Sequence, residues 1–210
     1  MPAEARSARP LARRGWKIVC CGVGAADARV AAERLVAAGC RALLVWGTAA
    51  GLDPELAAGA IVIPERVIAP DGTDHHADPA LRRELLAALP AGLLLSESPL
   101  ASCARPLVSA AEKRRLRALT GAIAADMEAA GVAAAATSWA VVRAVVDPAA
   151  WTLPSVVVDG TGTIRPAPGI ALELVRHPGE LVAVARLARA YRRACRNLEA
   201  IARALAAVEA

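Results

Sequence analysis

The sequence predicts a single-domain α/β protein built on a parallel or mixed sheet. Short apolar segments rich in β-branched residues alternate with helical segments, which is the rhythm of βαβ units. The 210 residues suffice for one domain with a proper core, and neither an internal repeat nor a linker divides them. No apolar run approaches the ~20 residues that span a bilayer. Residues 1–15 lack the apolar core of a signal peptide, so we expect one cytoplasmic domain over residues 1–210.

The composition argues against several kinds of site. Five cysteines lack the spacing of metal ligands, and we interpret them as reduced, buried thiols. Aromatic residues make up only 2% of the chain, which leaves no stacking platform for nucleic acid. The net charge of +5 suits nucleic acid, anionic lipid or no partner, so the distribution of charge decides more than its total.

The expected elements follow from apolar periodicity and from the glycines and prolines between segments. Gly22-Val23-Gly24 turns a first strand into a helix, but residue 27 is Asp where a dinucleotide fingerprint requires its third glycine, so NAD binding is rejected. Residues 47–52 are expected to form a turn in which small side chains let the backbone approach a ligand. In chain order, the expected strands are 17–21, 42–46, 60–63, 66–69, 92–95, 123–125 and 139–147, and the expected helices are 26–38, 80–89 and 110–119.

A polar loop is expected over residues 70–79. It holds Asp71, Asp74, His75, His76 and Asp78, so a metal site is one interpretation. Adjacent histidines seldom bind one ion together, so the favoured interpretation is a solvated loop without a metal.

The stretch Trp139–Pro148 contains the first candidate for chemistry. Its valine-rich run suits a strand buried on both faces, and Pro148 prevents the strand from continuing. In open α/β sheets ligands bind beyond the carboxyl ends of the strands, where Asp147 stands as a lone acid. The alternative role for Asp147 is the N-cap of a helix that starts near Pro148.

A second acid follows the strand expected over 123–125. Glu128 falls in the first turn of an alanine-rich helix, where the helix dipole favours a carboxylate. The alternative is an ordinary first-turn acid without a function.

The C-terminal part changes character twice. Residues 154–179 are rich in proline and glycine, which predicts an irregular crossover or a flap over a pocket. From Gly179 the pattern is strongly helical. Its apolar stripe comprises Leu181, Val184, Ala188, Tyr191, Cys195, Leu198, Ala202 and Leu205, and its basic stripe comprises Arg186, Arg189, Arg193, Arg196 and Arg203. Two interpretations of the basic stripe stay open: a solvated face, or contact with an anionic membrane surface.

Three segments, GTAAGLDPELAAGAIVIPERV, AADMEAAGVAAA and VVRAVVDPA, resemble in order and spacing the purine nucleoside phosphorylase/nucleosidase superfamily. Methylthioadenosine/S-adenosylhomocysteine nucleosidase is a similar member of it. The AEAR start, the AAEK stretch, the DME motif and the late RHPG are most similar to hopanoid-associated phosphorylase. The resemblance covers nearly the whole chain and implies a three-layer nucleoside phosphorylase-like fold, with helices flanking a mixed central sheet.

The resemblance also implies an enzyme that cleaves an N-glycosidic bond. The implied substrate is adenosylhopane, from which adenine is released and a ribosylated hopanoid remains, without a cofactor. Other adenine nucleosides are the alternative substrates, and a nucleoside-binding protein on the same fold is the non-enzyme alternative. We expect a cytoplasmic homodimer and no nucleic-acid partner. A lipid-linked substrate adds interest to the second interpretation of the C-terminal basic helix, which is contact with the inner face of the membrane.

The family's functional residues match positions at three places in this chain. Asp147 matches the acid that protonates purine N7, a role that requires burial to raise its pKa. Glu128 matches the acid that binds the ribose hydroxyls, and Met127 the residue that packs on the sugar. Arg143 matches an arginine on the sugar side, with a structural role as the alternative.

The nucleophile is implied to lie elsewhere in the same site. Thr48, with the backbone of Gly47 and Ala49, lies where the family holds the attacking water or phosphate, and Glu4 matches the general base. Val45 stands where phosphorylases of the superfamily place an arginine, which favours hydrolysis, although Arg6 is a further candidate for holding phosphate.

Two departures from the family pattern bear on the site. The family has a buried strand immediately before the AEAR motif, where this sequence has Met1. Either the start lies too late, or the sheet lacks its first strand and Glu4 is poorly anchored. The adenine-stacking residue is also hard to place in a chain without Phe, with Trp151 and Trp46 as the candidates.

Overall fold

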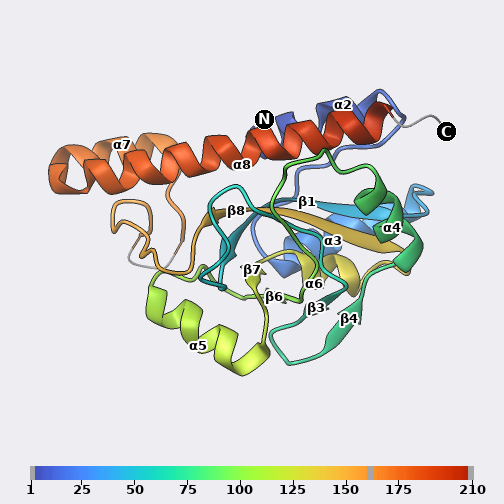
Figure 1. Cartoon of the computed structure of the whole chain (residues 1–210), viewed down its shortest axis with the longest axis horizontal. Coiled ribbons are helices and arrows are strands. Elements are labelled where there is room, and N and C mark those ends of the chain that lie inside the picture. Colours follow the sequence, from blue (N-terminus) through green and yellow to red (C-terminus); the bar gives the residue numbers. More distant parts are fainter. Residues whose placement is uncertain (1–2, 160–162, 208–210) are drawn as a thin grey trace.

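Eight strands form one mixed sheet in the computed structural model, which describes residues 3–159 and 163–207 (Figure 1). The strand order is β4-β3-β6-β7-β1-β8-β2-β5, and both parallel and antiparallel pairs occur. The predicted α/β class with a mixed sheet is therefore confirmed. The strands are β1 (Leu43–Gly51), β2 (Ile61–Val62), β3 (Arg66–Ile68), β4 (Asp74–His76), β5 (Leu95–Ser96), β6 (Leu100–Ser102), β7 (Ala124–Asp126) and β8 (Trp139–Asp147).

The two longest strands, β1 and β8, form the centre of the sheet. They pair in parallel from Leu43 opposite Trp139 onward, and a bulge near their ends brings Ala50 opposite Asp147. Nearly every residue of β8 is buried, as its valine-rich sequence predicts. The strand ends at Asp147, in agreement with the expected stop at the following proline.

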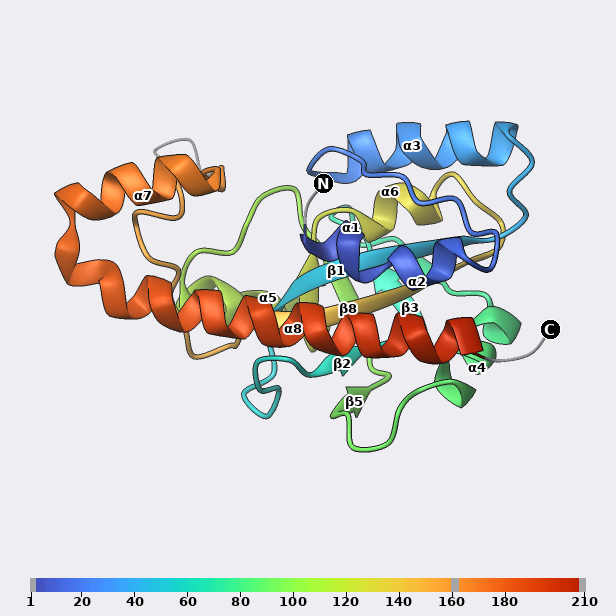
Figure 2. The same cartoon turned by 90° about the horizontal axis from the view of Figure 1, so that it is seen from above.

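Helices cover both faces of the sheet and complete three layers (Figures 1 and 2). Side chains alternate along β8, so that Val141 packs with α3 and α6 whereas Val142 packs with α4 and α8. The helices are α1 (Ala3–Ser7), α2 (Arg9–Ala12), α3 (Ala25–Ala37), α4 (Pro79–Ala87), α5 (Ala110–Thr120), α6 (Ala129–Ala133), α7 (Ala167–Arg176) and α8 (Leu181–Ala207), with a 3-10 turn at Pro178–Glu180. Among the helices of the described ranges, none has the length and apolar character for a membrane crossing.

Two expectations near the N-terminus are wrong. Residues 17–21 are apolar enough for a strand, but they pair with no described strand and form coil in which Val19 is 52% exposed. Residues 47–52 do not form a turn, because β1 continues to Gly51 and there pairs with β7. The sheet therefore begins at Leu43 within the described chain.

Three helical or loop boundaries also differ from expectation. Helix α6 begins at Ala129, so Glu128 stands at its N-cap position and not in its first turn. The crossover expected to be irregular over 154–179 contains α7. The loop over 70–79 contains the edge strand β4, whose Asp74 forms an ion pair with Arg66 at 2.5 Å.

The exposure of two groups of side chains was predicted only in part. All five cysteines are free thiols, but none is buried, and Cys20 and Cys21 are exposed in the coil before α3. The apolar stripe of the last helix is buried at Leu198 and Ala202 but exposed at Leu181. The difference arises because the first part of α8 extends, with α7, beyond the sheet (Figure 2).

Candidate active site

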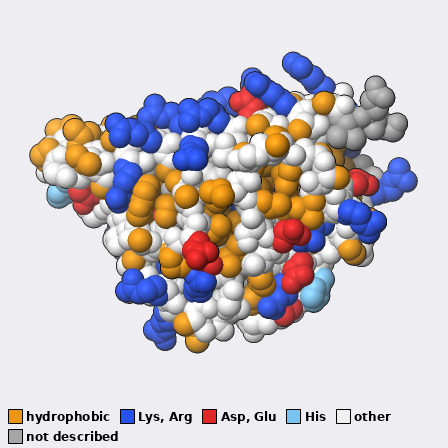
Figure 3. All heavy atoms as spheres, in the orientation of Figure 1, with side chains coloured by type: hydrophobic (Ala, Val, Ile, Leu, Met, Phe, Trp, Pro, Cys, Tyr) orange, Lys and Arg blue, Asp and Glu red, His pale blue; other side chains and the backbone are white. Residues whose placement is uncertain are grey.

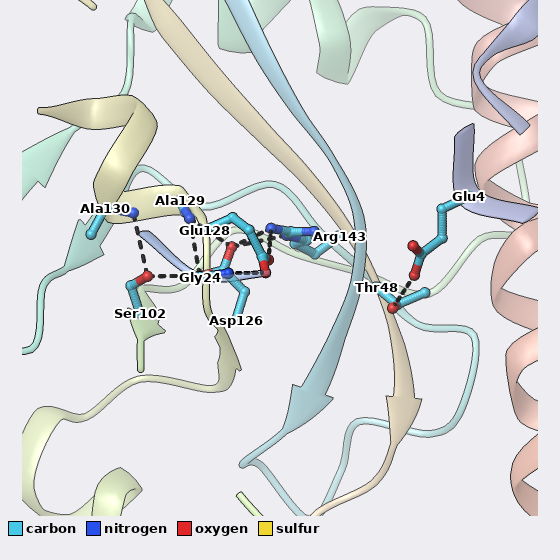
Figure 4. Close-up of polar contacts among 9 residues, drawn as sticks. All are labelled: Glu4, Gly24, Thr48, Ser102, Asp126, Glu128, Ala129, Ala130 and Arg143. Atoms are coloured by element: carbon cyan, nitrogen blue, oxygen red, sulfur yellow. Dashed lines mark hydrogen bonds and ion pairs between the residues drawn. The ribbon is translucent and has the colours of Figure 1, made fainter. Parts of the chain in front are cut away.

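Glu128 is held between the corner that joins β7 to α6 and the central strand β8 (Figure 4). Arg143 Nη2 donates to Glu128 Oε2 at 2.8 Å, and the backbone N–H of Gly24 donates to Glu128 Oε1 at 3.2 Å. The side chain of Glu128 is 20% exposed, so these two donors fix its direction while part of it still faces solvent.

Asp126, the last residue of β7, fixes the side chain of Arg143 by accepting hydrogen bonds from its guanidinium. Its Oδ2 accepts from Arg143 Nε at 3.0 Å and Nη2 at 2.6 Å, and it also accepts from the backbone N–H of Ala129. Ser102 donates to Asp126 Oδ1 at 3.0 Å. Burial opposes the charge of Arg143, but Asp126 and Glu128 together raise its pKa. Arg143 is thus a buried cation that links two acids, and its role on the sugar side stays a prediction.

Close packing of α3 on α6 brings Gly24 to Glu128. A Cβ on Gly131 would lie 2.0 Å from the carbonyl oxygen of Ala25, so only glycine allows α3 to begin this close to α6. Gly24 itself has a φ of 101°, which also favours glycine. The Gly22–Gly24 turn therefore positions a carboxylate, a role that the sequence analysis did not consider.

Glu4 reaches the other side of β1 from the short helix α1. Thr48 Oγ1 donates to Glu4 Oε1 at 2.5 Å, so Glu4 is anchored although no described strand precedes it in the sheet (Figure 4). Burial raises the pKa values of Tyr191 and Cys195 on α8, and the charge of Glu4 raises them further. Glu4 therefore lies under α8, against its buried side.

Gly47 lies between the cluster around Arg143 and the contact of Glu4 with Thr48. A Cβ at this position would lie 2.4 Å from Arg143 Nη1 and 4.0 Å from Glu4 Cδ. The missing side chain thus lets the guanidinium of Arg143 and the carboxylate of Glu4 approach the same point of β1. Beyond Gly47, β1 pairs with β7 only at Ala50 and Gly51, so the β7 side of Thr48 has no strand partner within the described sheet.

Asp147 is not the lone acid that the sequence predicts. Lys113 of α5 is fully buried, and its Nζ lies 2.6 Å from Asp147 Oδ2. The same Nζ donates to the carbonyl oxygens of Pro148 at 3.0 Å and Trp151 at 2.8 Å. Neither oxygen of the Asp147 carboxyl has a well-directed hydrogen bond within the described chain, so the contact is an ion pair set by distance. No helix begins at Pro148, which excludes the capping role.

The protonation of this pair follows from its burial. Burial raises the pKa of Asp147, while the nearby charge of Lys113 opposes that rise. Burial likewise lowers the pKa of Lys113, and Asp147 opposes that change. Burial thus favours the neutral form of each group, whereas the short contact between them favours the charged forms.

The two tryptophans considered for adenine are already engaged. The guanidinium of Arg186 lies 4.0 Å from the centre of the Trp151 ring, and its charge also lowers the pKa of Asp147. Trp46 Nε1 donates to Ser7 Oγ at 3.0 Å and so holds α1 against the sheet. Arg186 therefore faces the end of β8, although the sequence placed it in an outer basic stripe.

The remaining predicted residues stay predictions. Met127 is half-buried between Asp126 and Glu128, and Ala49 is buried within β1, where it pairs with β8. Nothing in their contacts tests a role toward a sugar or a nucleophile.

The structure brings together only some of the predicted residues. Glu4, Gly47, Thr48, Arg143 and Glu128 form one region around β1, whereas Asp147 has its own partner at the end of β8. A surface hollow of about 720 Å³ lies between α8 and the helices α1 and α2, and one of about 410 Å³ lies beside α3. Neither Glu128 nor Asp147 lines either of these two hollows. The convergence of these two acids on one cavity remains a prediction.

Lys113 and Asp126 are the functional candidates that the sequence analysis missed. Lys113 lies in the AAEK stretch and Asp126 in the DME motif, so both were visible without a role. A lysine among the arginines of an amphipathic helix gives no signal of its complete burial. An aspartate at the end of a buried strand, as at Asp126, does give such a signal, because β8 ends in the same way.

A family model described as the phosphorylase superfamily matches residues 14–153. No curated protein sequence matches the chain at a significant level. Several solved structures that match the chain share 15–20% identity with it, so they bear on the fold alone, and they agree with the nucleoside phosphorylase-like fold expected from the sequence.

Three of these structures show the range of the similarity. A mutant 5'-methylthioadenosine/S-adenosylhomocysteine nucleosidase of Helicobacter pylori, with 5'-methylthioadenosine in its active site, is 19% identical with a TM-score of 0.56; the match covers 61% of this chain and 65% of that one. The corresponding nucleosidase of Neisseria meningitidis, in complex with methylthio-immucillin-A, is 18% identical with a TM-score of 0.66, covering 89% and 79%. A futalosine hydrolase mutant of Helicobacter pylori is 18% identical with a TM-score of 0.53, covering 59% and 66%.

Proposed function

This chain belongs to the phosphorylase superfamily, and we propose that it cleaves the N-glycosidic bond of an adenosyl compound. The observation that carries the proposal is the placement of two acids: Asp147 is buried and its pKa is raised by that burial, and Glu128 is held by Arg143 and the backbone of Gly24. A buried acid that can donate a proton and a carboxylate held in a fixed position are the usual basis for combined acid and electrostatic catalysis.

Asp147 acts as the acid toward adenine in this proposal. Adenine leaves poorly as an anion, so a proton donated toward N7 lowers the barrier to bond cleavage. Burial at the end of β8 raises the pKa of the carboxyl and so favours its protonated form, and Lys113 fixes the carboxyl and the following turn through the carbonyls of Pro148 and Trp151.

Glu128 acts on the sugar. Its carboxylate binds the ribose hydroxyls and stabilises the positive charge that develops on the ribosyl ring as the bond breaks. Arg143 and Gly24 hold the carboxylate in place, so its orientation requires no reorganisation during the reaction. Met127, beside Glu128, packs on the sugar.

Glu4 and Thr48 position the nucleophile, with the backbone of Gly47 and Ala49. One carboxylate oxygen of Glu4 accepts from Thr48, which leaves the other to accept a proton from water. Val45 is buried in the core beside this region and offers no cation for phosphate, so we propose hydrolysis. Phosphorolysis is the alternative, with Arg6 of α1 as its anion-binding residue.

The substrate that we propose is adenosylhopane, which yields adenine and a ribosylhopane in hopanoid lipid biosynthesis. The support is the resemblance of the AEAR, AAEK, DME and RHPG motifs. We further propose that the protein, as a homodimer in the cytoplasm, meets this lipid at the inner face of the membrane through the exposed arginines of α8. Methylthioadenosine or S-adenosylhomocysteine is the alternative substrate.

One assay separates these possibilities. Adenine release is measured from adenosylhopane and from methylthioadenosine, each with and without phosphate, for the native protein and for Asp147→Asn. We expect release without phosphate, preferentially from adenosylhopane, and a loss of about 10²–10⁴-fold in Asp147→Asn. The assay is run at a temperature at which this variant is folded, as judged by its circular dichroism spectrum, because Lys113 stays buried without its partner. Strict dependence on phosphate refutes hydrolysis. Native protein that releases adenine from neither compound indicates a nucleoside-binding protein without catalysis.

A further inference from the structure

An apolar tip projects from the end of the molecule where α7 turns into α8 (Figures 1 and 2). Leu172 and Val175 on α7 are 57% and 81% exposed, and Leu181 and Val182 at the start of α8 are 56% and 79% exposed. Scattered exposed apolar residues are ordinary, but four large ones on adjacent turns form a contiguous patch, which marks an interaction surface.

The tip is apolar on both of its sides. The inner side, through Ile170 and Leu174, already packs on the buried valines Val156–Val158, together with Val184 and Leu187. Leu172 and Val175 are three residues apart and therefore share the opposite side of α7. The fold of the described chain uses only the inner side, so the outer side is left for a partner.

The charge beside the tip selects the kind of partner. Basic side chains line the edge of the molecule that α8 forms next to the apolar tip (Figure 3). Two acids lie within the tip: Glu173 is paired with Arg176 at 2.7 Å, and Glu180 accepts a hydrogen bond from Ser155 Oγ at 2.6 Å. At the far end of α8, the hollow beside α1 and α2 is lined by five arginines, Arg6, Arg9, Arg13, Arg196 and Arg203, and by the single acid Glu199, itself paired with Arg203 at 2.6 Å.

This combination fits an anionic bilayer better than a second copy of the chain. In a two-fold dimer the same surface faces itself, so the arginine row of α8 would meet another arginine row. Apolar side chains on a basic helical surface are the arrangement by which peripheral proteins insert into the headgroup region of anionic lipid.

We propose that the α7–α8 tip inserts Leu172, Val175, Leu181 and Val182 into an anionic membrane while the arginines of α8 contact the headgroups. The inference rests on the proposed function for its purpose, which is to bring a lipid-linked nucleoside to the enzyme. It adds an apolar anchor to the electrostatic contact already proposed for α8.

The test separates the two contributions by salt. Co-sedimentation is measured with equimolar phosphatidylethanolamine and phosphatidylglycerol vesicles, at low salt and at about 1 M salt, where the screening length falls to about 3 Å. The variant Val175→Ser/Val182→Ser is compared with Leu94→Ser/Leu119→Ser, which removes two large exposed residues away from α7 and α8. Arg189→Gln/Arg196→Gln forms the electrostatic arm.

We expect the tip variant to bind vesicles at least about tenfold more weakly at both salt concentrations, and the control variant to bind like the native protein. The arginine variant is expected to lose affinity only at low salt. The inference is overturned if the tip variant binds normally, if the native protein does not bind, or if the tip variant changes the mass of the protein in solution without lipid, which would assign the tip to a second copy.

Adenine release from methylthioadenosine in solution, measured on the same variants, keeps the two proposals apart. It is expected to be unchanged by the tip substitutions, because that substrate does not require a membrane. Vesicle binding without adenine release from either methylthioadenosine or adenosylhopane would leave the tip in place and refute the proposed enzyme. Adenine release without vesicle binding would refute only the membrane role of the tip.

Discussion

At the scale of single residues, the site depends on buried charges that are matched in pairs. Arg143 is matched to Asp126 and Glu128, and Lys113 is matched to Asp147. A buried ion pair contributes little net stability, but removing one partner leaves an uncompensated charge in the core. Each pair therefore fixes the position of a candidate catalytic acid at little net gain in folding free energy.

Removing Lys113 tests this dependence. Lys113→Met leaves Asp147 buried without its cation and deprives the carbonyls of Pro148 and Trp151 of their donor. We expect the free energy of unfolding, measured by urea titration, to fall by about 3–5 kcal/mol. Lys17→Met, at an exposed lysine, is the matched control and should change it by less than about 0.5 kcal/mol.

The double variant gives the decisive comparison. In Lys113→Met/Asp147→Asn no buried charge remains, so much of the lost stability should return. If the double variant is as unstable as the sum of the single variants, the two side chains do not act as a pair.

At the scale of elements, the packing of α3 on α6 is what brings a backbone donor to Glu128. Gly131→Ala places a Cβ 2.0 Å from the carbonyl oxygen of Ala25, so the start of α3 must move and the contact from Gly24 is lost. We expect a loss of about 1–3 kcal/mol in thermal unfolding and a higher KM for an adenine nucleoside.

A second glycine in a helix provides the control for that substitution. Gly169 of α7 has no atom nearer than 3.7 Å to its added Cβ, so Gly169→Ala should leave activity unchanged and raise stability by a few tenths of a kcal/mol or more. A Gly131→Ala protein with native KM would show that Glu128 does not need α3.

Strands and helices were predictable from the sequence where their apolar pattern matches the face that is buried in the structure. β8 and the second half of α8 follow from their apolar patterns because each is buried by the sheet or against it. Residues 17–21 have a strand-like pattern but no partner strand, and the local sequence alone does not show whether a neighbouring strand is present. The small residues of Gly47–Gly51 indicate a turn by composition, whereas the structure uses them to let β1 lie closely between neighbours.

At the scale of the whole molecule, α8 spans from the exposed tip to both regions of candidate catalytic residues. It covers Glu4 through Tyr191 and Cys195, and it carries Arg186 to Trp151 and Asp147. The sequence reveals the two acids and the basic helix separately. Their connection could not be predicted, because it depends on how a C-terminal helix lies across strands that are distant in the chain.

That connection predicts an effect of α8 on the acid. Burial raises the pKa of Asp147 above 3.8, and the charge of Arg186 lowers it. A general acid works only while protonated, so kcat/KM should fall as the pH rises through this pKa. The charge of Lys113 opposes this rise as well. Arg186→Gln removes only the charge of Arg186, so it should raise the pKa of Asp147 further and move the falling limb of the profile to higher pH.

Arg189→Gln is the matched control for this shift, because it removes an equally exposed arginine one turn further along α8. The pH profile of adenine release from methylthioadenosine should then remain that of the native protein. If the pH profile shifts equally in both variants, the total charge of the helix is responsible, because a direct effect on Asp147 should depend on the distance from each arginine to that carboxyl. No shift in Arg186→Gln would remove Asp147 as the group whose proton limits the reaction, and would leave α8 with only its contacts to Glu4 and to the surface.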